Sequence, residues 1–254
     1  MLALGVVPAL AQQASAVGAH RPGLVEVGKV QGSCLVSKVD PRDGKPKGQA
    51  NLTRGMTFSE GHLVRTNGND ALLELVFSNG AILRLVGQAS LEVKTFAQAS
   101  AVGVVPGKFR EIKEEPSTSV VQIELHYGKM VGEVHKLSAE SIFTVKTPVG
   151  LTRIRGTIWS DEFRRIPGGN RGEQISICAS GQIDVRDLNG SDPATAKQGE
   201  KVIVIGTLAA AELPASTNQR PKSVDLAPGD STTELKPAEP EKVKQLLDLV
   251  QSGR

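Results

Sequence analysis

The stretch SIFTVKTPVGLTRIRGTIWSDEF, residues 141–163, carries the densest β-strand signal of the sequence. Phe143, Val145 and Thr147 alternate with polar residues, which is the period of a half-buried strand. Pro148 cannot donate a hydrogen bond to a strand ladder, and Gly150 follows it. We therefore expect a bend or turn between two strands at this point.

The second strand of this stretch is predicted to begin at Leu151 and to continue through Arg155-Gly156-Thr157 to Ile158. A glycine inside a strand suggests a β-bulge. A bulge would turn Arg155 towards the interior, where its guanidinium would need acceptors. We predict this interior, structural role for Arg155. The alternatives are an ordinary surface charge and a contact with a partner's acidic group.

Short apolar runs with turn signals recur outward from this stretch in both directions. Asn79-Gly80 separates the runs 71–77 and 81–86, which predicts a hairpin. Further strands are predicted at 24–39, 91–93, 120–125, 130–134, 175–179, 183–185 and 201–205. This spacing is typical of an all-β sandwich, roll or solenoid. Residues 97–119 lack the pattern and are predicted to leave the core as a lid, a partner loop or tolerated surface.

The ends of the chain differ from this β region. Residues 1–16 are apolar and carry small residues at Ala9–Ala11 and Ala14–Ala16, which is typical of a secretory signal peptide. Residues 207–240 are rich in Pro, Ser and Thr and predict a disordered linker. Residues 241–252 predict an amphipathic helix. Its apolar face consists of Val243, Leu246, Leu247 and Val250. Docking on the chain's own core is favoured over docking in a dimer or on a partner.

Composition narrows the function classes. The 254 residues carry a net charge of +3 with scattered basic residues, so no electrostatic footprint for a nucleic acid is seen. Aromatic residues make up only 3 %, which suits thin layers packed by Val, Ile and Leu. The two cysteines, Cys34 and Cys178, have no metal-site spacing. They are interpreted as small buried hydrophobes, with a disulfide as the alternative.

The sequence shows no persuasive catalytic set. No nucleophile elbow, P-loop or dinucleotide fingerprint occurs, and the histidines His20, His62, His126 and His135 lack zinc-motif spacing. Strand alternation assigns Glu74 and Glu92 to the solvent-facing side. We therefore expect no enzyme activity, no cofactor and no metal site.

The segment TPVGLTRIRGTIW resembles the threonine-proline and arginine-glycine-threonine signature of the FecR domain, the periplasmic domain of ferric-citrate-type regulators. The resemblance extends to EGHLVRTNGNDALLELVFSNGAILRLVGQASLEV upstream and to SGQIDVRDLNG and KQGEKVIV downstream, and so covers residues 25–205. It implies a twisted, solenoid-like roll of mostly antiparallel strands at 24–206. It also implies that the motif residues Thr147, Pro148, Arg155, Gly156 and Thr157 determine the fold.

The resemblance also implies a function. FecR-type periplasmic domains receive a signal from an outer-membrane receptor. No sigma-controlling segment or membrane span is recognised before residue 25, so the signalling role is left open. The favoured interpretation is an exported, non-enzymatic module, periplasmic or extracellular, that binds an envelope protein, a glycan or another ligand. A structural or adhesive envelope protein and a carbohydrate-active enzyme on a β-solenoid are the alternatives.

Overall fold

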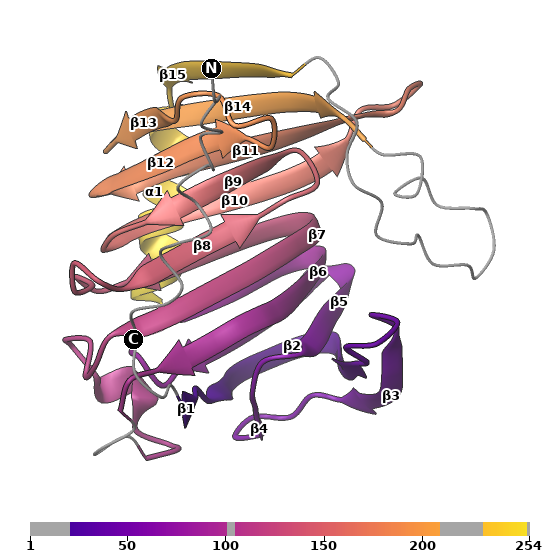
Figure 1. Cartoon of the computed structure of the whole chain (residues 1–254), viewed down its shortest axis with the longest axis vertical. Coiled ribbons are helices and arrows are strands. Elements are labelled where there is room, and N and C mark those ends of the chain that lie inside the picture. Colours follow the sequence, from indigo (N-terminus) through magenta and orange to yellow (C-terminus); the bar gives the residue numbers. More distant parts are fainter. Residues whose placement is uncertain (1–20, 101–104, 209–230, 253–254) are drawn as a thin grey trace, which may run out of the picture.

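The computed structural model describes residues 21–100, 105–208 and 231–252, whose strands pair into one continuous sheet (Figure 1). The all-β class is as predicted. Among the described strands every pairing is antiparallel except that of β7 with β8. The strands are β1 (Arg21–Pro22), β2 (Val25–Val39), β3 (Pro46–Asn51), β4 (Thr57–Phe58), β5 (His62–Phe77), β6 (Ile82–Gln98), β7 (Ser119–Val134), β8 (Ile142–Lys146), β9 (Gly150–Ile154), β10 (Thr157–Arg165), β11 (Arg171–Ser180), β12 (Gln182–Asp187), β13 (Ala194–Lys197), β14 (Glu200–Thr207) and β15 (Thr232–Pro237).

Four long strands, β2, β5, β6 and β7, bend at one common level. Each has a glycine with positive φ at the bend: Gly32, Gly68, Gly87 and Gly128. The pairing register is interrupted beside these glycines. The sequence pattern predicts several of these strands as shorter ones, because a glycine at positive φ ends the period-two pattern without ending the strand.

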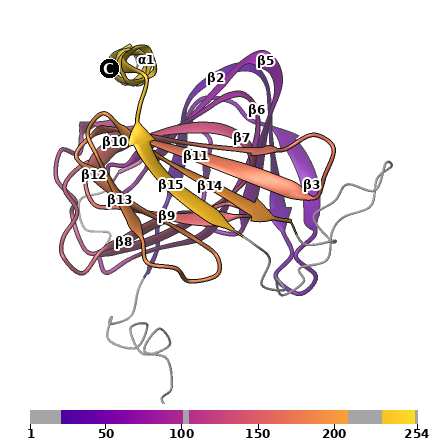
Figure 2. The same ribbon diagram turned by 90° about the horizontal axis from the view of Figure 1, so that it is seen from above.

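The sheet divides into two layers at β7. Residues Val120–Glu124 of β7 pair with β8, whereas Gly128–Val134 pair with β10. One layer, here called the β8 layer, continues through β9 and β12 to β13. The other, the β10 layer, continues through β11 and β14 to β15. The two layers face each other across the core, as the view from above shows (Figure 2).

The core between the layers is built mainly from aliphatic side chains. Trp159 on β10 and Phe143 on β8 are fully buried beside β7, where the sheet divides. Their rings pack edge to face, with centroids 5.7 Å apart. Gly132 makes room for the indole, because a Cβ at that position would lie 2.2 Å from a ring carbon of Trp159. A chain with few aromatic residues thus places its single tryptophan at the point where the two layers separate.

Helix α1 (Pro240–Gln251) covers the outer face of the β10 layer (Figure 2). Leu246 and Val250 are buried against Val131, Ile177 and Ala179, with Val243 and Leu247 at the margin. The predicted docking of the amphipathic helix on the chain's own sheet is confirmed. No helix within the described residues combines the length and apolar character that crossing a membrane requires.

Two segments differ from the sequence predictions. Strand β15 pairs with β14 although it lies within the predicted linker 207–240, because its polar residues form an exposed edge strand with little apolar signal. Residues 1–16, with the predicted signal peptide, and 209–230 lie outside the described residues.

The excursion after β6 contains a short 3₁₀ turn, Phe109–Glu111, whose Phe109 is buried against Val76 and Ile82. This part of the excursion is therefore packed on the sheet.

Candidate functional site

The arginine-glycine-threonine motif forms the corner at which the chain crosses from the β8 layer to the β10 layer. Strand β9 ends at Ile154 and β10 begins at Thr157, and these two strands do not pair with each other. Gly156 adopts φ +92°, a conformation that an L-residue with a side chain rarely takes. The motif therefore lies between two strands, whereas the sequence pattern predicts it inside one strand.

A second crossing lies against the first. Gly181, at φ +85°, connects β11 of the β10 layer to β12 of the β8 layer. A Cβ at Gly181 would lie 2.7 Å from the carbonyl oxygen of Gly156. The Thr157 hydroxyl donates a hydrogen bond of 2.7 Å to the carbonyl of Ser180 and accepts one of 3.1 Å from the amide of Gln182. Thr157 thus joins the two corners into one rigid unit.

Arg155 is exposed at this corner, so the prediction of an interior arginine is wrong. The physical reason is that the chain turns after Ile154 instead of forming a bulge, so that the arginine lies on the outside of the turn. No ion pair joins Arg155 to a carboxylate among the described residues. Gly156 and Thr157 therefore hold the corner, and Arg155 faces solvent.

The backbone beside Arg155 carries two further basic residues. A Cβ at Gly156 would lie 2.9 Å from the Cα of Lys136 and 3.4 Å from the carbonyl oxygen of His135. Lys136 is exposed and His135 is half-buried. In the part of the chain that the structure describes, no ion pair to Lys136 is found either. We call Arg155, Lys136 and His135 the basic corner.

The threonine-proline part of the motif makes the tight turn between β8 and β9. The Thr147 hydroxyl accepts hydrogen bonds from the amides of Val149 and Gly150, and it donates one of 2.6 Å to Gln174 on β11. Pro148 lies inside this turn, at a position that needs no strand hydrogen bond. Through its bond to Gln174, Thr147 ties the turn of the β8 layer to the β10 layer.

Asp161 lies at the centre of a polar network between the layers and is fully buried. Its Oδ1 accepts hydrogen bonds from Ser176 at 2.5 Å and Thr152 at 2.9 Å, and its Oδ2 accepts one from the Trp159 indole at 2.9 Å. Burial raises the pKa of Asp161, and these hydrogen bonds lower it by less. No pattern in the sequence marks Asp161, because its partners come from three strands.

A second buried network lies on β5 and β6, on the same outer face of the sheet as α1. Glu74 and Arg84 are cross-strand neighbours on β5 and β6, and they are only 2 % and 1 % exposed. Arg84 Nη2 lies 2.9 Å from Glu74 Oε2, so the two side chains form an ion pair, although its geometry is not that of a hydrogen bond. Arg110 of the docked 3₁₀ turn pairs with the same carboxylate. The prediction that Glu74 faces solvent is wrong, because the excursion covers this side of the strand.

The two cysteines lie far apart in the sheet. Cys34 on β2 and Cys178 on β11 are both free and buried, and β5, β6, β7 and β10 lie between their strands in the sheet. Burial raises the pKa of both thiols. The disulfide alternative is therefore not supported, and the interpretation as small hydrophobes fits.

His62 Nδ1 lies 3.0 Å from the carbonyl oxygen of Ser59 and so has a local partner. His20 lies outside the described residues. His126 on β7 lies beside Glu92 of β6. Glu92 is only 7 % exposed, so the prediction that it faces solvent is also wrong, because His126 and Lys94 lie against its carboxylate.

Comparison with known proteins gives only distant similarity. No protein-family model and no curated protein sequence matches the chain. Two crystal structures of a candidate anti-sigma factor from Parabacteroides distasonis ATCC 8503 are similar, at 2.50 and 1.65 Å resolution, with 11 % and 12 % sequence identity and a TM-score of 0.44 each. The alignments cover 73 % of this chain and 63 % and 64 % of those chains, so this chain spans less than two thirds of their length. Similarity at this level does not establish a family.

Proposed function

We propose that this chain is a non-enzymatic binding module of the cell envelope, related to the FecR domain, whose basic corner contacts an acidic group of a protein ligand. Signal reception is the specific role that the FecR resemblance suggests for such a module. Within the motif, Gly156 and Thr157 then determine the fold, and Arg155 binds the ligand.

The exposure of Arg155 is the observation that carries the proposal. An arginine that holds a fold together is normally buried against acceptors, because its guanidinium has five N–H donors to satisfy. Arg155 is instead exposed, without an ion pair to the described residues, on a corner whose backbone is fixed by Gly156 and Thr157. A guanidinium held on a rigid backbone loses less freedom when a carboxylate binds. The corner thus suits the recognition of an acidic group.

The charge around the corner supports the same ligand chemistry. Lys136 is exposed on the backbone segment that touches Gly156. Two cations on neighbouring segments attract a ligand with acidic residues, and an arginine can bind a carboxylate through two parallel hydrogen bonds. We therefore propose a protein segment with Asp or Glu side chains as the ligand.

Export is part of the proposal and rests on the apolar residues 1–16. The expected mature protein begins after Ala16, or alternatively after Ala11. N-terminal sequencing of the protein recovered from the envelope fraction tests this. An intact Met1 on protein recovered from the cytoplasm contradicts it.

The binding proposal is tested with the full chain immobilised and exposed to an envelope extract. Wild type, Arg155→Ala and Arg165→Ala are compared, and retained proteins are identified by mass spectrometry. Arg165 is an exposed arginine at the far end of β10 and serves as the matched control. We expect a protein ligand that wild type and Arg165→Ala retain and Arg155→Ala loses. Equal retention by all three proteins contradicts the role of the corner.

A further inference from the structure

Two carboxylates face each other on the outer face of the sheet, on β6 and on the part of β7 that pairs with β8. Glu92 on β6 and Glu124 on β7 are direct partners in the antiparallel register. Like charges directly opposite each other on neighbouring strands are destabilising. The neighbours Leu91, Val93 and Ile123 are buried in the core, so the two acidic side chains share the other face. This pair requires a cation.

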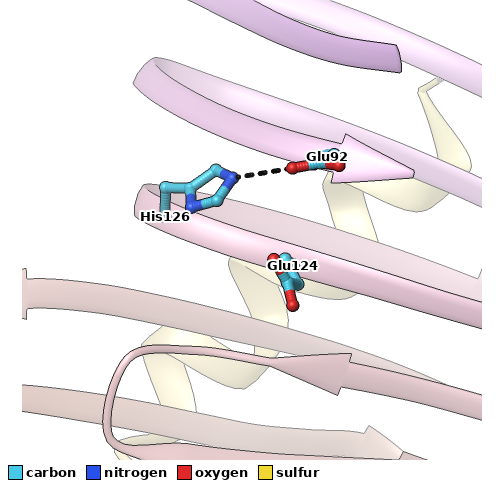
Figure 3. A group of neighbouring side chains, drawn as sticks. All are labelled: Glu92, Glu124 and His126. Carbon is cyan, nitrogen blue, oxygen red and sulfur yellow. Dashed lines mark ion pairs between the residues drawn. The ribbon is translucent and has the colours of Figure 1, made fainter. Parts of the chain in front are cut away.

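An irregularity in β7 brings an imidazole to the same place. Ser90 pairs with Tyr127, while the next residue, Leu91, pairs with Leu125, so that His126 is an extra residue on β7. The bulge directs His126 towards Glu92, with Nε2 3.6 Å from Glu92 Oε2 (Figure 3). Bulges recur where a protein redirects a side chain for a purpose. One ligand atom from each of Glu92, Glu124 and His126 lies within 4.8 Å of the other two.

Lysines neutralise the carboxylates in the structure. Lys94 Nζ lies 3.1 Å from Glu92 and 3.8 Å from Glu124, and Lys146 Nζ lies 3.9 Å from Glu124. Burial raises the pKa of Glu92, but hydrogen bonds from His126 and Lys94 outweigh burial and hold this pKa below its usual value. The Lys94 side chain is 41 % exposed, so its ammonium group can leave for solvent.

We propose that Glu92, Glu124 and His126 bind a divalent transition-metal ion of the Zn²⁺ type, which displaces the ammonium group of Lys94. An imidazole with two carboxylates is a donor set that suits zinc better than calcium or magnesium, which prefer oxygen ligands alone. Bond lengths of about 2.0–2.2 Å require the three ligand atoms to approach one another more closely than they do in the structure. The Glu124 and His126 side chains are 28 % and 41 % exposed and are free to make that adjustment.

The site would remain open on its outer side. Three protein ligands leave one position of a tetrahedral zinc ion for water or for an external ligand. The metal would also replace the repulsion between Glu92 and Glu124 by a bridge between β6 and β7. This inference is independent of the basic corner, so that either can fail without the other.

The test is a Zn²⁺ titration of the full chain by calorimetry at neutral pH, with Ca²⁺ as the comparison ion. We expect one Zn²⁺ per chain and much weaker Ca²⁺ binding. Glu124→Gln and His126→Ala should each lower the Zn²⁺ affinity about tenfold or more, since each removes a ligand. Both side chains are partly exposed, so neither change should prevent folding.

The decisive variant is Lys94→Met, which removes the competing cation and should raise the Zn²⁺ affinity. A cluster that serves only as an ion-pair network would not gain zinc affinity in this way. Glu234→Gln, in an exposed ion pair with Lys236 on β15, is the control and should bind zinc as wild type does. Absence of zinc binding in both wild type and Lys94→Met overturns the proposal, and so does binding that survives both Glu124→Gln and His126→Ala.

Discussion

The Thr157 hydroxyl donates a hydrogen bond of 2.7 Å to the carbonyl of Ser180, and this contact joins the two corners at which the chain changes layers. Thr157 begins β10 and Ser180 ends β11. The bond therefore lies where the chain passes from β9 to β10 and, further along, from β11 back to β12. The same hydroxyl accepts from Gln182. One side chain therefore satisfies backbone groups on both sides of Gly181.

Replacing Thr157 by valine should destabilise the protein, because valine keeps the shape but leaves the Ser180 carbonyl and the Gln182 amide without this partner. The expected loss in the free energy of unfolding is about 1–3 kcal/mol. Chemical denaturation measures it. Thr144→Val is the control, since the Thr144 hydroxyl makes only a 3.4 Å bond, and its effect should stay within about 0.5 kcal/mol. Equal effects of the two changes would contradict the role of Thr157.

Alanine at Gly181 should cost more than alanine at Gly190. Both glycines have positive φ, +85° and +83°, so both variants carry the same backbone penalty of about 1–2 kcal/mol. Only at Gly181 does a Cβ meet neighbouring atoms, 2.7 Å from Gly156 and Thr157, whereas nothing lies within 4 Å at Gly190. Denaturation midpoints compare the two variants. A loss at Gly181 no larger than at Gly190 means that the two corners are not in close contact.

Asp161 should make stability depend on pH in one direction. Burial raises its folded-state pKa above the ordinary value of 3.8. Its contribution to stability is therefore fully present below that pH and is lost as the pH rises through the folded-state pKa. Asp161→Asn removes this titration. The free energy of unfolding of wild type, relative to the variant, should fall with rising pH.

Urea denaturation at several pH values, followed by the fluorescence of the single Trp159, measures this difference. The tryptophan donates directly to Asp161 and lies in the core, so its signal reports on the region concerned. A difference that stays constant, or that grows as the pH rises, is inconsistent with the raised pKa.

The docked helix gives a further prediction. Leu246→Asp combined with Val250→Asp places charges on a buried apolar contact, so that α1 should leave the sheet while the β core remains folded. Limited proteolysis should then cut the chain after Thr207 faster than in wild type. Lys244→Asp, on the exposed face of the helix, should leave the rate unchanged. If the double variant is cut no faster than Lys244→Asp, the contacts of Leu246 and Val250 do not hold the helix.

Local patterns predicted the elements of this fold better than they predicted side-chain environments. The hairpin at Asn79-Gly80 and the amphipathic face of α1 follow from short-range signals and are found in the structure. Glu74 alternates correctly with core residues, but the excursion that covers it lies more than thirty positions further along the chain. Alternation gives the face of a strand and does not show whether another segment covers that face.

For Arg155 the sequence pattern fails in the other direction, because it predicts a buried side chain and the structure exposes it. The glycine beside it signals an irregular backbone, and both a bulge and a corner satisfy that signal. The two differ only in which strands pair afterwards, and that is decided by β7, β8 and β12 together. The Asp161 network and the pair of Glu92 with His126 likewise depend on pairing between strands, which the sequence pattern leaves open.

The affinity of the retained envelope protein for wild type, Arg155→Ala and Arg165→Ala, measured beside their unfolding free energies, tests the central claim most directly. We predict that Arg155→Ala loses at least about tenfold in affinity, or about 1.4 kcal/mol, while its stability stays within about 1 kcal/mol of wild type. Arg165→Ala should match wild type in both measurements. Wild-type affinity in Arg155→Ala, or a loss of about 3 kcal/mol or more in its stability, would contradict the claim that Arg155 serves binding and not the fold.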